Sequence, residues 1–140
     1  MSPVSAAIGV KQFELLPNNI KMRSEMHSFY IKLFKDHDNL YVVKNPSILY
    51  KSNNWLSRII VERKSKRIST AKIREQFLDQ NIETRHFWKP MHLQPIFKDA
   101  PYYGDKVSES LFKTGLCLPS GSNLTLEDKD RIRAVIAKFE

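Results

Sequence analysis

The sequence predicts an α+β fold, in which helices pack against a few short strands. Apolar residues recur at steps of three and four along several stretches, which is typical of helices with one buried face. Other short stretches are rich in β-branched or apolar residues and lie next to turn signals, which is typical of strands. We therefore expect one layered core, built in the order helix, helix, strand, helix, strand, loop, helix, strand, helix.

The first 36 residues predict two helices. Pro3 is tolerated in a first turn, and the apolar residues after it recur at helical steps over residues 3–16. Pro17 has no amide hydrogen to donate, so we expect it to end the first helix or to open the second. The second helix continues to about Asp36, with an apolar stripe that comprises Ile20, Met26, His27, Phe29, Tyr30, Ile31, Leu33 and Phe34.

Loops, strands and one helix follow. Residues 37–54 are rich in turn signals with short extended pieces between them, and residues 55–63 predict a strand. Thr70 is a plausible cap for a helix that runs to about Gln80. Its predicted buried side consists of Ile73, Phe77 and Leu78. Residues 82–88 then predict a short strand.

The last third predicts two helices around a strand. Residues 106–114 form a short helix with Gly115 at its C-terminal cap, and residues 116–119 are a buried strand. The final helix begins with a Thr-x-x-Asp capping arrangement at Thr125. Its predicted buried face consists of Ile132, Val135, Ile136 and Phe139.

Size and composition indicate a single cytoplasmic domain. A length of 140 residues suits one modest core, and 41% hydrophobic with 27% charged residues is ordinary for a folded protein. The apolar runs are too short to span a bilayer, and the start lacks the basic leader of a secretory signal. The single cysteine, Cys117, excludes an internal disulfide and fits a reducing compartment.

A net charge of +8 points toward acidic partners. Much of this charge lies in residues 58–74, where seven of the seventeen residues are Lys or Arg. Nucleic-acid binding would favour interleaved aromatic residues or glycines, whereas this segment holds an apolar strand followed by a polar turn. We favour a solvated turn over a nucleic-acid patch, and attraction to a phosphorylated small molecule is a third interpretation.

The stretch "RHFWKPMHLQP", residues 85–95, concentrates polar and aromatic side chains between two prolines. One interpretation is a binding surface: Trp88 offers a flat stacking face, Arg85 and Lys89 offer charge to an anion, and His92 and Gln94 face the same way if the segment is extended. The other is a loop whose Phe87 and Trp88 fill the core. Residue types alone leave both open, and no glycine-rich phosphate loop, metal-ligand set or activated nucleophile stands out elsewhere.

Four segments together resemble a known family. They are "MSPVSAAIGVKQFELL", "NIETRHFWKPMHLQPIFKDAPYYG", "SESLFKTGLCLPSGSNLT" and the closing helix. They are similar to the C-terminal part of the DegT/DnrJ/StrS family of pyridoxal phosphate-dependent nucleotide-sugar aminotransferases, especially those that aminate 4-keto-6-deoxy UDP-sugars. The resemblance implies the small C-terminal domain of fold type I, the aspartate aminotransferase fold, with a small antiparallel sheet packed against helices.

The resemblance also implies a function for the complete enzyme. Glutamate would load the pyridoxal phosphate, and a keto nucleotide-sugar, UDP-linked by this likeness, would take the amino group for glycan or polysaccharide synthesis. Its substrate would lie against residues 85–94, with Trp88 and His92 near the sugar, Arg85 and Lys89 near the diphosphate, and Gln94 as support. Ser120 and Ser122 are weaker candidates.

The family's Schiff-base lysine and most of its cofactor-binding residues would lie upstream of Met1. We therefore expect no catalytic residue, no bound pyridoxal phosphate and no activity from this chain alone. Residues 1–16 would pack on a large cofactor domain or on a dimer partner, and residues 17–140 would be the small domain. The alternative is a stand-alone module that binds sugar nucleotides or regulates related enzymes.

Overall fold

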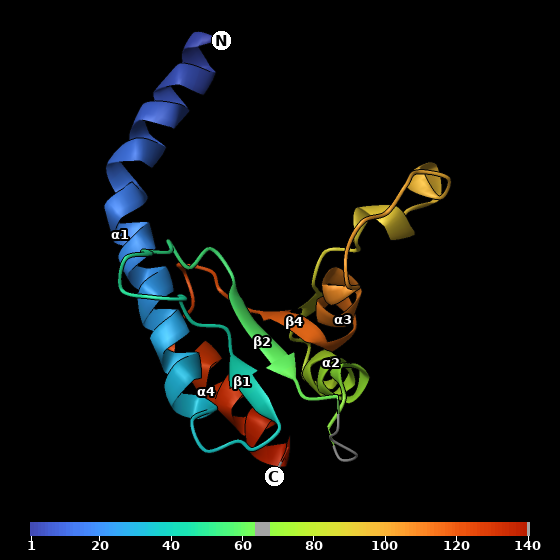
Figure 1. The fold of residues 1–140 in the computed structure, drawn as a ribbon. Coiled ribbons are helices and arrows are strands. Elements are labelled where there is room, and N and C mark those ends of the chain that lie inside the picture. The colour runs from blue at the N-terminus through green and yellow to red at the C-terminus, as the bar shows by residue number, and fades with distance from the viewer. Residues whose placement is uncertain (64–67, 140) are drawn as a thin grey trace.

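The computed structural model describes residues 1–63 and 68–139, and it confirms the predicted α+β class (Figure 1). Its four strands form one antiparallel sheet in the order β1-β2-β4-β3. The strands are β1 (Leu40–Val42), β2 (Ser57–Val61), β3 (Arg85–His86) and β4 (Gly115–Leu118). The longer helices are α1 (Pro3–Leu33), α2 (Thr70–Asp79), α3 (Val107–Thr114) and α4 (Leu126–Ile136).

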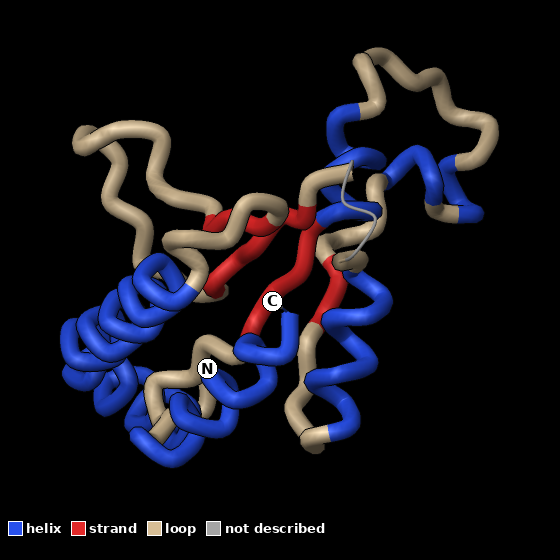
Figure 2. Tube along the Cα trace, turned by 90° about the horizontal axis from the view of Figure 1, so that it is seen from below, coloured by secondary structure: helices blue, strands red, loops and turns tan. Residues whose placement is uncertain are grey.

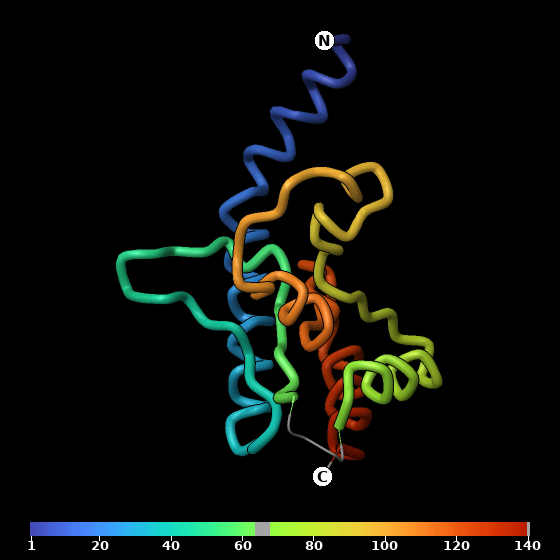
Figure 3. The backbone as a smooth tube through the Cα atoms, turned by 45° about the vertical axis from the view of Figure 1, so that its right-hand side comes forward, coloured from blue at the N-terminus to red at the C-terminus, as the bar shows by residue number. Residues whose placement is uncertain are grey.

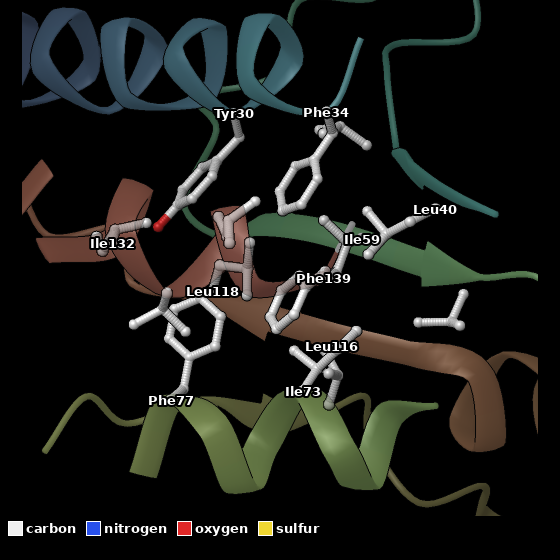
Figure 4. Close-up of a cluster of buried hydrophobic side chains, with 14 of the residues drawn as sticks. Tyr30, Phe34, Leu40, Ile59, Ile73, Phe77, Leu116, Leu118, Ile132 and Phe139 are labelled. Carbon is white, nitrogen blue, oxygen red and sulfur yellow. The ribbon is translucent and has the colours of Figure 1, made fainter. Parts of the chain in front are cut away.

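One face of the sheet is buried under α1, α2 and α4, and Figure 2 shows most of the helical mass on one side of the strands. Strand β2 alternates fully and partly buried residues, so Ser57, Ile59 and Val61 point into this core. Leu116 and Leu118 of β4 join them, and side chains from all three helices fill the space between (Figure 4). The apolar helix positions in this cluster are Met26, Tyr30, Phe34, Ile73, Phe77, Ile132, Val135 and Ile136.

Helix α1 is a single helix of 31 residues with Pro17 inside it, so the expected break at this proline is wrong. The proline removes one hydrogen bond, the one to the carbonyl of Phe13 four residues earlier. Residues 1–18 are all exposed, so water can solvate that carbonyl at small cost. The prediction rested on the cost of an interior proline, and solvent exposure at this turn reduces that cost.

The helix caps agree with the sequence in two cases out of three. Helix α4 begins with a complete capping box between Thr125 and Asp128. Gly115 occupies the C-cap of α3 as predicted, although its φ of −98° is extended backbone and not left-handed. Helix α2 is capped by Ser69, whose hydroxyl accepts from the Lys72 amide, and not by Thr70, which begins the helix and donates to the Lys113 carbonyl instead.

The predicted buried faces are largely confirmed. The four predicted core residues of α4 are all buried, as are Ile73 and Phe77 of α2. Leu78 is 71% exposed, so its assignment to the core is wrong: it follows Phe77 by one position, about 100° around the helix, and faces solvent. The polar turn predicted after β2 falls on residues 64–67, which lie outside the described residues.

None of the described helices, including α1, is both long and apolar enough to cross a membrane.

His27 of α1 couples the stability of this core to pH. Burial, and after it the positive charge of Arg58, lowers the pKa of His27 below its usual value. In the unfolded chain the histidine pKa is near ~6.5, so at mildly acidic pH the unfolded chain binds a proton at His27 that the folded chain does not bind. The contribution of neutral His27 to the free energy of unfolding is therefore fully present above pH ~6.5 and is lost as the pH falls below that value.

We expect the free energy of unfolding to fall between neutral pH and mildly acidic pH, and to fall less in His27→Leu. Urea denaturation at a series of pH values measures both slopes. Met26→Leu is the matched control, because it alters a buried neighbour without removing a titratable group. Equal slopes in wild type and His27→Leu would contradict the assignment.

Candidate functional site

Residues 85–95 leave the sheet at its edge strand and enter a projecting lobe, which we define as residues 88–106. The segment begins as β3, which pairs with β4, and continues through two 3-10 turns, Met91–Leu93 and Pro95–Phe97. The lobe extends away from the sheet before α3 returns to it (Figure 3). This placement makes the stretch a surface feature held at one end by strand pairing.

Arg85 lies in a row of side chains across three strands. Strand register pairs Arg58 with Cys117 and Cys117 with Arg85, so the three side chains share one face of the sheet, opposite Ile59 and Leu116. The Arg85 Nε donates to Glu83 Oε1 at 2.9 Å, and both side chains are highly exposed. Two cations therefore lie on the face that α1, α2 and α4 leave uncovered.

Cys117, between these arginines, is buried and free. Burial raises the pKa of its thiol, and the charge of Arg58 opposes this to a smaller extent. A protonated, buried thiol is a poor nucleophile, so we assign Cys117 no catalytic role.

The burial of Phe87 and Trp88 tests the two interpretations of this stretch, a binding surface or a loop whose aromatic side chains fill the core. Phe87 is half-buried, and its ring lies against Gly115, on the sheet face opposite Leu116 and Leu118. Trp88 turns outward and is 61% exposed. The interpretation of a core-filling loop is therefore wrong for Trp88. Phe87 is half-buried, but it is not among the side chains that form the core or pack against it.

Trp88 has a neighbour that the sequence did not single out. The ring of Trp55, from the loop before β2, lies with its centroid 6.0 Å from that of Trp88 at an interplanar angle of 41°. Trp55 is 57% exposed, although we had placed it at the start of a strand. The strand begins two residues after Trp55, at Ser57. The only local sign that Trp55 lies in a loop was the turn pair Asn53-Asn54 directly before it.

His92 and Gln94 do not share one side of an extended segment, so that expectation is wrong. His92 lies in the first 3-10 turn, which begins after the buried Pro90. Gln94 ends the turn and folds back, and its Nε2 lies 3.4 Å from the carbonyl of Lys89. The two prolines cause this: each precedes or opens a tight turn instead of stiffening an extended strand.

His92 is engaged within the lobe. Its ring stacks on Tyr102 with centroids 3.8 Å apart, and its Nε2 lies 3.1 Å from Glu109 Oε1 of α3. The Tyr102 hydroxyl in turn accepts from the amide of Lys106. These contacts join the beginning of the lobe to its end, which gives His92 a packing role in addition to any contact with a ligand.

Replacing His92 by alanine is expected to loosen the lobe. The substitution removes one ring stack and one polar contact, each worth about 1 kcal/mol. We expect faster trypsin cleavage after Lys98, which lies within the lobe, while the urea midpoint of the whole domain changes little. Ile96→Ala is the control, since Ile96 lies in the same lobe and is 81% exposed. Equal cleavage rates for wild type and His92→Ala would show that these contacts do not hold the lobe.

Ser120, a weaker candidate for substrate binding, has a structural role at the ends of two strands. Its buried hydroxyl accepts from the Ser57 amide at 2.7 Å and donates to the Leu118 carbonyl at 2.7 Å. Both bonding directions of the hydroxyl are occupied, so Ser120 ties the start of β2 to the end of β4. Ser122 is half-buried in the turn that follows.

Comparisons with known proteins agree with this architecture. The model of the DegT/DnrJ/EryC1/StrS aminotransferase family matches residues 1–137. The protein EpsN of Bacillus subtilis, described as a pyridoxal phosphate-dependent aminotransferase, is 31% identical over 140 residues, which cover 97% of this chain and 35% of EpsN. The GDP-perosamine synthase of Escherichia coli O157:H7 is 28% identical over 139 residues, covering 99% of this chain and 36% of that enzyme.

A solved structure shows the same fold. PseC of Helicobacter pylori, an aminotransferase involved in the biosynthesis of pseudoaminic acid, superimposes with a TM-score of 0.81 at 24% identity, covering 95% of this chain and 36% of PseC. The chain thus spans about a third of the length of the relatives that it matches.

Proposed function

Since the chain belongs to the DegT/DnrJ/EryC1/StrS aminotransferase family, we propose that it is the small C-terminal domain of an enzyme that moves an amino group from glutamate to a keto nucleotide-sugar. The amino sugar would enter a cell-surface polysaccharide or another glycan. The observation that carries this proposal is the family match over residues 1–137, together with coverage of only about a third of each relative.

We assign substrate contact to the outward side of the stretch 85–94. Arg85, Trp88 and Lys89 are exposed and lie where a sugar nucleotide could meet them. Trp88 would pack against a ring, and the two cations would meet the diphosphate. His92 and Gln94 are half-buried, so their part in binding is to hold the lobe in place beside the substrate.

The described residues do not fit a complete site for pyridoxal phosphate. A Schiff-base lysine needs a desolvated pocket, in which its amine loses its proton readily. Every described lysine is exposed except Lys129, which is half-buried on the surface of α4. We therefore assign no cofactor contact to this chain, and cofactor attachment falls to a part of the enzyme outside these residues.

For the nucleotide we propose only its class, a nucleoside diphosphate. The resemblance in the sequence favours a UDP-linked substrate, whereas one relative is by name a GDP-perosamine synthase. Both are nucleoside diphosphate sugars, and the exposed cations suit the diphosphate that they share.

Reconstitution tests this function. The chain is mixed with a separately expressed cofactor domain of EpsN, and transfer of the amino group from glutamate to a keto nucleotide-sugar is followed by mass spectrometry of the sugar. We expect no transfer by the chain alone and measurable transfer by the mixture. Charge-removing variants at Arg85 and Lys89 should lower the transfer, whereas Lys129→Ala should not. Failure at every mixing ratio, with a covalent chimera also inactive, would refute the proposal.

We further propose that the chain self-associates through the exposed part of α1. Large apolar side chains on residues 3–16 face solvent, among them Ile8, Val10 and Phe13, and soluble monomers seldom expose so much apolar surface on one segment. Light scattering at about 100 μM should show a dimer or larger species, because a micromolar interface is saturated there. Phe13→Glu should restore a monomer, and Tyr103→Glu, at an exposed aromatic residue of the lobe, should not. A monomeric wild-type chain would be the contrary result.

A further inference from the structure

The two tryptophans of this chain are its only ones, and they lie together. Trp55 and Trp88 are 33 residues apart in sequence and come from two different loops, yet their rings are 6.0 Å apart. Each ring remains more than half exposed. Two large aromatic rings that touch each other but stay open to solvent are unusual in a folded core, since aromatic side chains normally bury most of their surface.

Trp55 is open but firmly placed. Its amide donates to the Asn53 side chain at 3.1 Å, and the Asn54 side chain donates to Ser24 Oγ of α1 at 3.1 Å. Asn54 has a φ of 49°, a left-handed backbone conformation that asparagine tolerates better than most residues. The backbone beneath the ring is therefore fixed to α1, so little conformational entropy is lost when the ring meets a ligand.

Positive charge lies at the backbone of Trp55. The guanidinium of Arg23, on α1, has its Nη1 3.4 Å from the carbonyl of Trp55. Among the described residues Arg23 has no ion-pair partner, and its buried Nε has no hydrogen-bond partner. A cation that is partly desolvated and has no ion pair with a carboxylate of the described residues is suited to an anionic group.

We propose that Trp55 and Trp88 together form a stacking platform for the base of a nucleoside diphosphate, and that Arg23 supplies positive charge beside it. This inference rests on the proposed function and adds Trp55 and Arg23 to the substrate surface. The 41° angle between the rings lets a base stack on one indole while its edge meets the other, which is a favoured aromatic arrangement. Because every base has a π-face, the platform adds affinity without selecting the base.

The full 140-residue chain is titrated with UDP and, separately, with GDP. Both tryptophans of the chain report from the platform, so quenching of their fluorescence, excited where the bases do not absorb, senses binding at this place alone. Ligand-observed NMR gives Kd for variants that lack a reporter ring. We expect saturable quenching by both nucleotides, with Kd values that differ by less than about tenfold.

Trp55→Ala is expected to weaken UDP binding about tenfold, within the range for removing one base-stacking ring. Trp55→Phe should restore most of the affinity, because it keeps a π-face. Tyr103→Ala removes an aromatic residue of the lobe that is even more exposed, at 89%, and it should leave Kd unchanged. Circular dichroism of each variant confirms that the fold is intact.

The results separate this inference from the proposed function. If Lys89→Ala weakens UDP binding while Trp55→Ala does not, the platform is wrong and the substrate surface stands. If Trp55→Ala changes light scattering but not Kd, the pair is a contact between copies of the chain, which also overturns the platform. If neither nucleotide binds the wild-type chain into the millimolar range, the inference fails; the proposed function fails with it only if the chimera is also inactive.

Discussion

Replacing Phe77 by alanine is expected to lower the free energy of unfolding by about 4 kcal/mol. Phe77 of α2 has no exposed surface, and its ring lies 6.2 Å from that of Phe139 in the core between the sheet and the helices (Figure 4). Alanine would leave a cavity lined by side chains from several elements, which cannot all move to fill it. Urea denaturation followed by circular dichroism measures the loss.

Leu78→Ala is the matched control for this substitution. The two positions are adjacent, and both variants remove a large apolar side chain, but Leu78 is 71% exposed. We expect Leu78→Ala to change the free energy of unfolding by less than about 0.5 kcal/mol, as is usual at surface positions. Comparable losses at the two positions would mean that α2 is rotated relative to the structure described above.

Gly115→Ala is expected to cost about 3 kcal/mol, at the upper end for overpacking. A Cβ at Gly115 would lie 2.5 Å from two ring atoms of Phe87 and 2.7 Å from the carbonyl oxygen of Leu111. The ring could move, but the carbonyl belongs to the backbone of α3 and cannot move alone. The effect is steric, because the φ of Gly115 is one that alanine adopts freely. The midpoint of urea denaturation reports it.

Two comparisons isolate the steric cause. Gly9→Ala makes the same chemical change inside α1, where nothing lies within 4 Å of the new atom, and it should stabilise the helix by up to about 1 kcal/mol. The double variant Phe87→Ala with Gly115→Ala should lose less free energy of unfolding than the two single variants lose together, because the clash with the ring is gone. Strict additivity would place the strain at Leu111 alone.

Local patterns were sufficient to predict most of the elements. Helices α2, α3 and α4 were found to within a few residues, because their apolar periodicity and their caps are encoded within one or two turns. Three of the four strands were predicted from β-branched or apolar runs beside turn signals, and the structure shortens them to the residues that pair. Strand β1 lies in residues 37–54, where only short extended pieces were expected. Helix α1 was divided wrongly, because the cost of Pro17 depends on solvent exposure, which a local pattern does not contain.

The candidate site was predictable as a segment but not as a geometry. The density of polar and aromatic residues at 85–95 pointed to a surface stretch, and the exposed Trp88 agrees with it. The engagement of His92 with Tyr102 and Glu109 depends on how the lobe closes, and no spacing rule predicts such a closure. The contact between Trp55 and Trp88 depends on which strands are neighbours in the sheet, and that information is spread over the whole chain.

Helix α1 has a mechanical consequence. At 1.5 Å per residue, its 31 residues span roughly 46 Å, of which the first half protrudes and the second half is clamped in the core. Any body attached to the protruding half acts on the core as through a lever arm: a tilt of ~5° at the core would displace the free end by ~2–4 Å. Pro17, where one backbone hydrogen bond is missing, is the most compliant point of that lever and lies close to the edge of the clamp.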